Sequence, residues 1–169
     1  MDLLEAAGGS TRAGGLSVLA QSADLREMSW HGKRLALLRP LTYMNRSGEA
    51  VAGFLSASGL DPGKQLLVAF DDLDVPLGSV RLKLGGSAGT HRGMASIVSG
   101  LGHGRFPRLK MGIGPKPAGA DAAEFVLAEF RQEERSLVES MLEKGLKLAE
   151  AVVCHGWDLA ISKFHRKEP

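Results

Sequence analysis

The stretch Leu66-Leu67-Val68-Ala69-Phe70-Asp71-Asp72-Leu73-Asp74 places three acids directly after five apolar residues. A short, wholly apolar run of this kind is typical of a central strand that is buried on both faces. In open α/β sheets, ligands bind at the carboxyl ends of such strands. The carboxylates could orient a histidine or cap a turn, whereas a hard metal would need more oxygen ligands than this run supplies.

Strand and helix patterns alternate around this run. Alternating or wholly apolar residues predict further strands at residues 16–20, 34–38, 79–84 and 109–113. A helix end at residues 3–7 and helices at residues 46–60, 94–101, 132–155 and 157–164 follow from glycine stops and from apolar spacing of three and four. We therefore expect one α/β domain over residues 1–169. Its architecture would be three-layer α/β/α around a mixed, mostly parallel twisted sheet.

Composition narrows the class of protein. The chain has 169 residues, of which 44% are apolar, and no apolar run reaches the roughly 18 residues of a membrane-spanning helix. The segment Met1–Glu5 lacks the basic and apolar regions of a secretory signal. The single cysteine, Cys154, excludes an intrachain disulfide and a multi-thiolate zinc site, and its helical position predicts burial. We expect a cytoplasmic protein with no membrane partner.

The charged residues are unevenly distributed. Between Val75 and Ala120 there is no acid, whereas Asp121–Glu150 holds eight acids against four bases. Such segregation could build one face for an anion such as a phosphate backbone, or the bases could disperse over several surfaces in the fold. The seven bases of the acid-free segment are Arg81, Lys83, Arg92, Arg105, Arg108, Lys110 and Lys116.

Asn45 is the only asparagine in the chain, and it lies where a predicted strand gives way to a predicted helix. One interpretation is a helix N-cap, for which asparagine is among the best residues. The other is a carboxamide at the edge of the sheet that binds a carbonyl group or orients a water molecule. The two interpretations are compatible.

The loop Gly85–Gly93 has a glycine at four of its nine positions and joins a predicted strand to a predicted helix. Backbone N–H groups at a helix N-terminus can bind phosphate. The loop matches neither the Walker A pattern nor Gly-x-Gly-x-x-Gly in register. A flexible turn therefore remains the alternative to a phosphate site.

Four segments of the chain have a distinctive order and spacing. They are Leu38-Arg-Pro-Leu-Thr-Tyr-Met-Asn-Arg-Ser-Gly-Glu-Ala-Val51, Asp71-Asp-Leu-Asp-Val-Pro-Leu-Gly78, Arg81-Leu-Lys-Leu-Gly-Gly-Ser-Ala-Gly-Thr-His-Arg-Gly93 and Arg108-Leu-Lys-Met-Gly-Ile-Gly114. Taken together, these segments resemble bacterial-type peptidyl-tRNA hydrolase. Their order and spacing agree with the family over residues 34–130, and C-terminal helices follow at residues 131–165.

The resemblance implies a reaction. The family hydrolyses the ester between a peptide and the terminal ribose of tRNA, without metal or other cofactor. A histidine activates water in this mechanism, Asp71 would orient that histidine, and Asn45 would place the substrate carbonyl and the water. Tyr43 and Met44 would line the site for the peptidyl-adenosine end.

The resemblance also implies how tRNA is held. Lys83 and Lys110 match basic positions that clamp the tRNA 5′ phosphate, next to the acceptor stem. His91 and Arg92 match substrate-binding positions in the glycine loop. We expect the chain to act as a monomer on peptidyl-tRNA.

The sequence departs from the family in two places. Arg92 stands where the family has an asparagine. The family's first strand, which is central in its sheet, and the segment carrying its catalytic histidine have no counterpart, so by this resemblance we expect the chain to begin about twenty residues after the family's start. Met1 could be an internal methionine of a longer gene, a partner could fill the gap, or the chain could be a non-catalytic tRNA- or ribosome-binding relative. We expect this polypeptide alone to hydrolyse peptidyl-tRNA at least about a hundredfold more slowly than a full-length relative.

Overall fold

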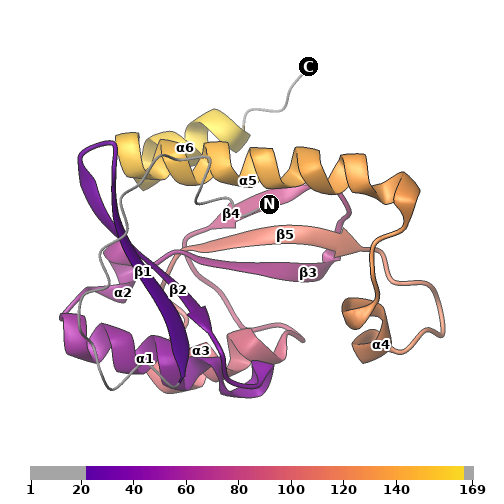
Figure 1. Cartoon of the computed structure of the whole chain (residues 1–169), viewed down its shortest axis with the longest axis horizontal. Coiled ribbons are helices and arrows are strands. Elements are labelled where there is room, and N and C mark those ends of the chain that lie inside the picture. Colours follow the sequence, from indigo (N-terminus) through magenta and orange to yellow (C-terminus); the bar gives the residue numbers. More distant parts are fainter. Residues whose placement is uncertain (1–21, 166–169) are drawn as a thin grey trace. The chain divides into compact units, whose positions relative to one another are not determined.

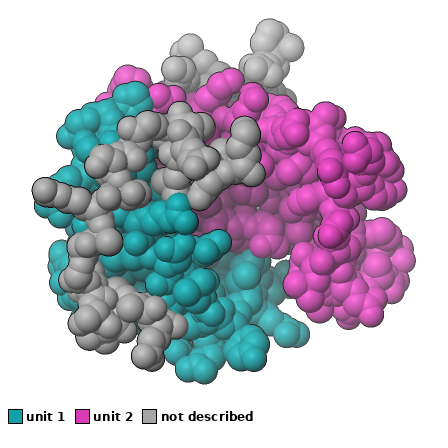
Figure 2. Space-filling view, in the orientation of Figure 1, with its two compact units in different colours: residues 1–62, 86–104 teal, residues 63–85, 105–169 magenta. Residues whose placement is uncertain are grey.

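A computed structural model describes residues 22–165. The helix end predicted at residues 3–7 and the strand predicted at residues 16–20 lie outside the described residues. The chain divides into two compact units, which Figure 2 colours separately. Unit 1 comprises residues 1–62 and 86–104, and unit 2 comprises residues 63–85 and 105–169.

The described part of unit 1 contains a β-hairpin. Strand β1 (Ala23–Trp30) pairs antiparallel with β2 (Lys33–Pro40) along its whole length (Figure 1). The turn between the two strands consists of His31 and Gly32, whose φ angles are +48° and +71°. Two successive positive φ angles are the geometry of a type I′ turn, whose twist matches that of paired strands. The sequence predicted β2, but it did not predict β1.

Helices α1 (Ser47–Ser58) and α3 (Arg92–Leu101) pack together in unit 1, and the 3₁₀ turn η2 (Met44–Arg46) precedes α1. Small residues allow the two helix backbones to approach closely. The Gly48 N–H donates to Ser96 Oγ at 2.9 Å, and a Cβ built on Gly100 would lie 3.1 Å from the Gly48 carbonyl oxygen. Both helices end at a glycine in the left-handed conformation, Gly59 and Gly102, as helix C-termini commonly do.

Unit 2 holds a three-stranded mixed sheet in the order β3-β5-β4. Strand β3 (Val68–Pro76), preceded by the short helix α2 (Pro62–Gln65), runs parallel to β5 (Arg108–Gly114). Strand β4 (Val80–Lys83) runs antiparallel to β5. The expected mixed α/β fold is confirmed. The predicted strand of residues 66–70 continues to Pro76 in the structure, so the acids lie within the strand rather than after it.

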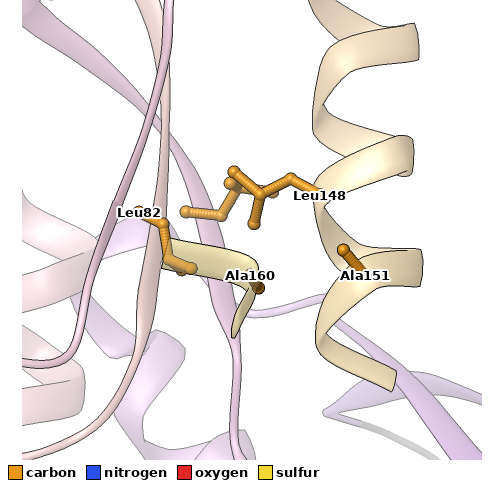
Figure 3. Close-up of a cluster of buried hydrophobic side chains, with 5 residues drawn as sticks. Leu82, Leu148, Ala151 and Ala160 are labelled. Carbon is orange, nitrogen blue, oxygen red and sulfur yellow. The ribbon is translucent and has the colours of Figure 1, made fainter. Parts of the chain in front are cut away.

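Helices α5 (Arg135–His155) and α6 (Trp157–His165) cover one face of this sheet (Figure 1). The buried cluster between the sheet and these helices consists of Leu82, Leu109, Leu148, Ala151 and Ala160 (Figure 3). Helix α4 (Ala122–Leu127) and the 3₁₀ turn η3 (Gln132–Glu134) lead into α5. The Asp121 carboxylate caps α4 by accepting the N–H groups of Ala123 and Glu124.

The burial predicted for Cys154 is wrong, because its side chain is exposed. The buried positions of α5 are Met141, Gly145, Leu148 and Ala151. This stripe stops at Ala151, since α5 ends at His155 and Gly156 redirects the chain into α6. Among residues 22–165, no helix is both long and apolar enough to cross a membrane.

The close approach of α1 and α3 yields a test. A methyl group at position 48 would overlap the Ser96 carbonyl oxygen, which cannot move without displacing α3. We expect Gly48→Ala to lower the free energy of unfolding by about 3 kcal/mol, measured by urea denaturation. Gly53→Ala is the matched control, because Gly53 is exposed within the same helix and alanine there should stabilise by about 0.5–1 kcal/mol. Equal stability of Gly48→Ala and the wild type would contradict this packing.

Candidate functional site

Asn45 lies in the middle of η2 and is exposed. The interpretation of Asn45 as a helix N-cap is wrong, because Arg46 occupies the N-cap position of α1 and no side chain caps that helix. No hydrogen bond joins the Asn45 carboxamide to any residue within 22–165. Both its N–H₂ donors and its carbonyl acceptor are therefore available to a ligand.

A shallow groove of about 540 Å³ runs along the contact between α1 and α3 in unit 1. Asn45 and Glu49 line the groove from the α1 side, and Arg92 and Ser96 line it from the α3 side. Glu49 holds the Arg46 guanidinium through two hydrogen bonds of 2.7 and 2.9 Å, which lower the pKa of Glu49 and raise that of Arg46. Sequence reasoning missed Glu49, although it lies four residues after Asn45.

Tyr43 and Met44 are exposed to 81% and 55%, which is unusual for large hydrophobic side chains. Met44 Sδ lies against the start of α3, where a Cβ on Gly93 would be 2.5 Å from the sulfur. The Ser47 hydroxyl donates to the Met44 carbonyl oxygen at 2.9 Å. These contacts hold the backbone of residues 43–47 in place and leave the Tyr43 ring open to a ligand.

The glycine loop ends at His91, whose side chain caps α3. His91 Nδ1 accepts the Met94 N–H at 3.0 Å, so this nitrogen is occupied while the cap is formed. Arg92 follows as the first residue of α3 and is exposed. Within the part of the chain that the structure describes, Arg92 forms no ion pair.

The acids of β3 divide between different roles. Asp72 is 8% exposed; its Oδ1 accepts the Asp74 N–H at 2.8 Å, and its Oδ2 accepts Lys110 Nζ at 2.5 Å. This carboxylate therefore caps a turn and neutralises a cation. Asp71 pairs in register with Met111 and is partly exposed. Because successive strand residues point to opposite faces of a sheet, Asp71 does not share the Asp72 environment.

Lys83 and Lys110 lie on one face of the sheet of unit 2. Lys83 is opposite Arg108 and Arg81 is opposite Lys110, which makes the two lysines diagonal neighbours on adjacent strands, about 7–8 Å apart. Lys83 is exposed, whereas the Lys110 ammonium bonds to Asp72 and lies 5.8 Å from the Phe70 ring centroid. The two lysines are therefore unequal in their freedom to bind an anion.

The acid-free segment does not form a single exposed face. Arg108 is 2% exposed, and its guanidinium lies 4.7 Å from the Phe106 ring centroid; burial lowers the pKa of this group. Lys110 is paired with Asp72 as described above. Among residues 22–165, no group of three histidine, cysteine, aspartate or glutamate side chains is placed to hold a metal ion.

Known proteins match the chain over most of its length. The family model for peptidyl-tRNA hydrolase matches residues 8–169. The peptidyl-tRNA hydrolase of Chloroflexus aggregans is 43% identical over 143 residues, which cover 85% of this chain and 76% of that protein. The Carboxydothermus hydrogenoformans protein of the same name is 45% identical over 135 residues, or 80% and 71% of the two chains. A crystal structure of peptidyl-tRNA hydrolase from Acinetobacter baumannii has a TM-score of 0.85 at 28% identity, covering 99% of this chain and 82% of that one.

The ion pair between Asp72 and Lys110 yields a prediction. Lys110→Met would leave the Asp72 carboxylate buried without its cation, and we expect a loss of about 3 kcal/mol in the free energy of unfolding. The double variant Asp72→Asn with Lys110→Met should recover most of that loss, because no unpaired charge remains. Urea denaturation of the two variants and the wild type measures both effects. A double variant less stable than Lys110→Met would rule out charge compensation as the role of the pair.

Proposed function

The chain belongs to the peptidyl-tRNA hydrolase family, and on that premise we propose that it hydrolyses the ester bond of peptidyl-tRNA and releases free tRNA. The single observation that carries the proposal is the family match over residues 8–169. In the reaction, a water oxygen attacks the ester carbonyl carbon. The bond from that carbon to the ribose oxygen breaks, and the ribose hydroxyl leaves with a proton.

Asn45 positions the substrate carbonyl and the attacking water in this proposal. The free carboxamide supports the role, because it has a donor for the carbonyl oxygen and an acceptor for the water. Asp71 orients the base, which the resemblance assigns to a histidine. Asp71 is partly exposed on β3, and the Asp72–Lys110 ion pair does not include it.

The exposed Tyr43 and Met44 contact the peptidyl-adenosine end of the substrate. Arg92 and His91 contribute from the start of α3, and Arg92 would bring a positive charge to the groove that also holds Asn45. A positively charged side chain binds a negatively charged phosphodiester more strongly than it binds an uncharged amide group. The tRNA 5′ phosphate binds at Lys83 and Lys110, with the acceptor stem beyond it, and the protein acts as a monomer.

Removal of the Asn45 carboxamide tests the reaction. We expect Asn45→Ala to slow the release of peptide from peptidyl-tRNA by about 10²-fold relative to the wild-type chain, with less than a threefold change in Kd for tRNA. The reason is that the carboxamide acts on the reacting carbonyl and not on the RNA. Gln65→Ala, which removes a carboxamide from a distant part of the sequence, is the control. A wild-type chain that binds tRNA but shows no hydrolysis above the uncatalysed rate would contradict the proposal.

The two lysines should differ in their effect on tRNA binding. Lys83→Ala should weaken binding and reduce the slope of log K against log salt by about one, because one phosphate contact is lost. Lys110→Met should change the slope less, since Asp72 already shares that ammonium.

Removal of the tRNA 5′ phosphate should weaken binding to the wild type more than binding to Lys83→Ala. Arg105→Ala, an exposed cation outside the matched positions, is the control. If Lys83→Ala binds both forms of tRNA as the wild type does at every salt concentration, the assignment of Lys83 to the phosphate is wrong.

A further inference from the structure

The tip of the β1–β2 hairpin carries an aromatic and basic cluster, which we call the hairpin tip and define as Trp30, His31, Lys33 and Arg34. We propose that the hairpin tip is a second RNA-binding site, where an unpaired base stacks on the Trp30 indole and neighbouring phosphates bind Lys33 and Arg34. The inference rests on the proposed function in one respect, because it takes the RNA to be the body of the tRNA substrate.

The turn fixes the arrangement of these side chains. His31 and Gly32 both have positive φ, so Trp30 and Lys33 are the first cross-strand pair beyond a tight turn. Their side chains lie on the same face of the hairpin, and Arg34, which pairs with Ser29, lies on the other face. The His31 ring lies against the indole, with ring centroids 5.3 Å apart and a tilt of 42°. The tip thus presents an aromatic pair with a cation on each side of the hairpin.

The cations of the tip differ from the other cations of the hairpin. Arg39 Nη2 lies 3.1 Å from Asp24 Oδ2, and Arg26 lies 3.7 Å from the same oxygen. By contrast, Lys33 and Arg34 are exposed and form no ion pair with any residue in the described range 22–165. The nearest acid on the face of Arg34 is Glu27, which is opposite Ala36 and forms no ion pair with any residue of the described range. The positive charges of Lys33 and Arg34 are therefore available to a ligand.

RNA is the partner that uses every part of this cluster. Proteins that bind single-stranded nucleic acid combine aromatic side chains, on which bases stack, with cations that hold the backbone. The acidic side chains of a peptide could bind Lys33 and Arg34, but these side chains have no ring that could stack on the partly exposed Trp30. The combination of two cations, Lys33 and Arg34, with an aromatic ring therefore favours a nucleotide chain over an acidic protein.

The hairpin also sets the length of the ligand. Strand β2 runs from the tip to Pro40, a span of about 23 Å at 3.3 Å per residue, and Tyr43–Asn45 follow soon after Pro40. A ligand that reaches both the tip and the Asn45 groove must therefore be longer than a terminal nucleotide with its peptide. The tRNA body beyond the ester meets this requirement.

Intrinsic fluorescence and salt-dependent binding test the hairpin tip in the full chain with deacylated tRNA as the probe. We expect tRNA to quench the Trp30 emission, and Trp30→Phe, which keeps only Trp157, to lose that quenching. The double variant Lys33→Ala with Arg34→Ala should raise Kd about tenfold and lower the salt slope by about two. Arg39→Ala is the matched control, because it removes a hairpin cation that Asp24 already pairs.

The inference would be overturned if the double variant kept the wild-type Kd and salt slope, or if Arg39→Ala weakened tRNA binding as much as the double variant does. It would also be overturned if polyglutamate quenched the Trp30 emission as strongly as tRNA does. A second assay tests the proposed hydrolase activity separately from RNA binding at the hairpin tip. Its substrate is a short ester, an N-acylated aminoacyl adenosine, which lacks the tRNA body. The tip variants should cleave that ester at the wild-type rate and lose efficiency on peptidyl-tRNA through a higher KM. Absence of ester cleavage in every variant would count against hydrolysis, while the fluorescence and binding results would still decide the hairpin tip.

Discussion

The parallel ladder between β3 and β5 depends on a close backbone approach that only glycine permits. A Cβ built on Gly112 would overlap the Pro76 carbonyl oxygen, and one on Gly114 would overlap the Leu73 carbonyl oxygen. The register shifts between Asp72 and Pro76 where this approach occurs. The Gly-Ile-Gly at the end of the fourth family segment is therefore a steric requirement of the sheet. Strand β5 in turn pairs with β4 and contributes Leu109 to the cluster under α5 and α6.

This ladder also decides what the neighbouring charges do. It places Asp72 and Lys110 side by side on the same face, and their ion pair offsets part of the charge that Lys110 offers to a ligand. Arg108 is buried, so its guanidinium is not exposed to a ligand. Segregation of charge along the sequence therefore overstates the charge that a substrate meets. Lys83 and Arg92, which are exposed and form no ion pair with described residues, are the stronger candidates for anion contacts.

Local patterns predicted the elements that local forces determine. The apolar spacing of α1, α3 and α5 and the glycines that end α1 and α5 depend on residues close together in sequence. Strand β1 was missed because three of its eight residues are charged, so apolar alternation is broken, and its conformation depends on pairing with β2. The extension of β3 through its acids was missed for a similar reason, since the glycines of β5 hold that segment in the sheet.

The residues of the candidate site were predicted from the resemblance, one by one. The contacts that arrange these residues in space join parts of the chain that no sequence pattern connects. Met44 lies against Gly93, the Ser47 hydroxyl donates to the Met44 carbonyl oxygen, and His91 caps α3 one residue before Arg92. The residues with the strongest local contacts are thus the ones that fix the backbone. Tyr43 and Asn45 lie on either side of Met44 in the sequence, and both side chains are exposed to solvent. A short 3₁₀ turn cannot bury all of its side chains against one helix. These contacts therefore fix the backbone that carries two exposed side chains, as the positioning role proposed for Asn45 would need.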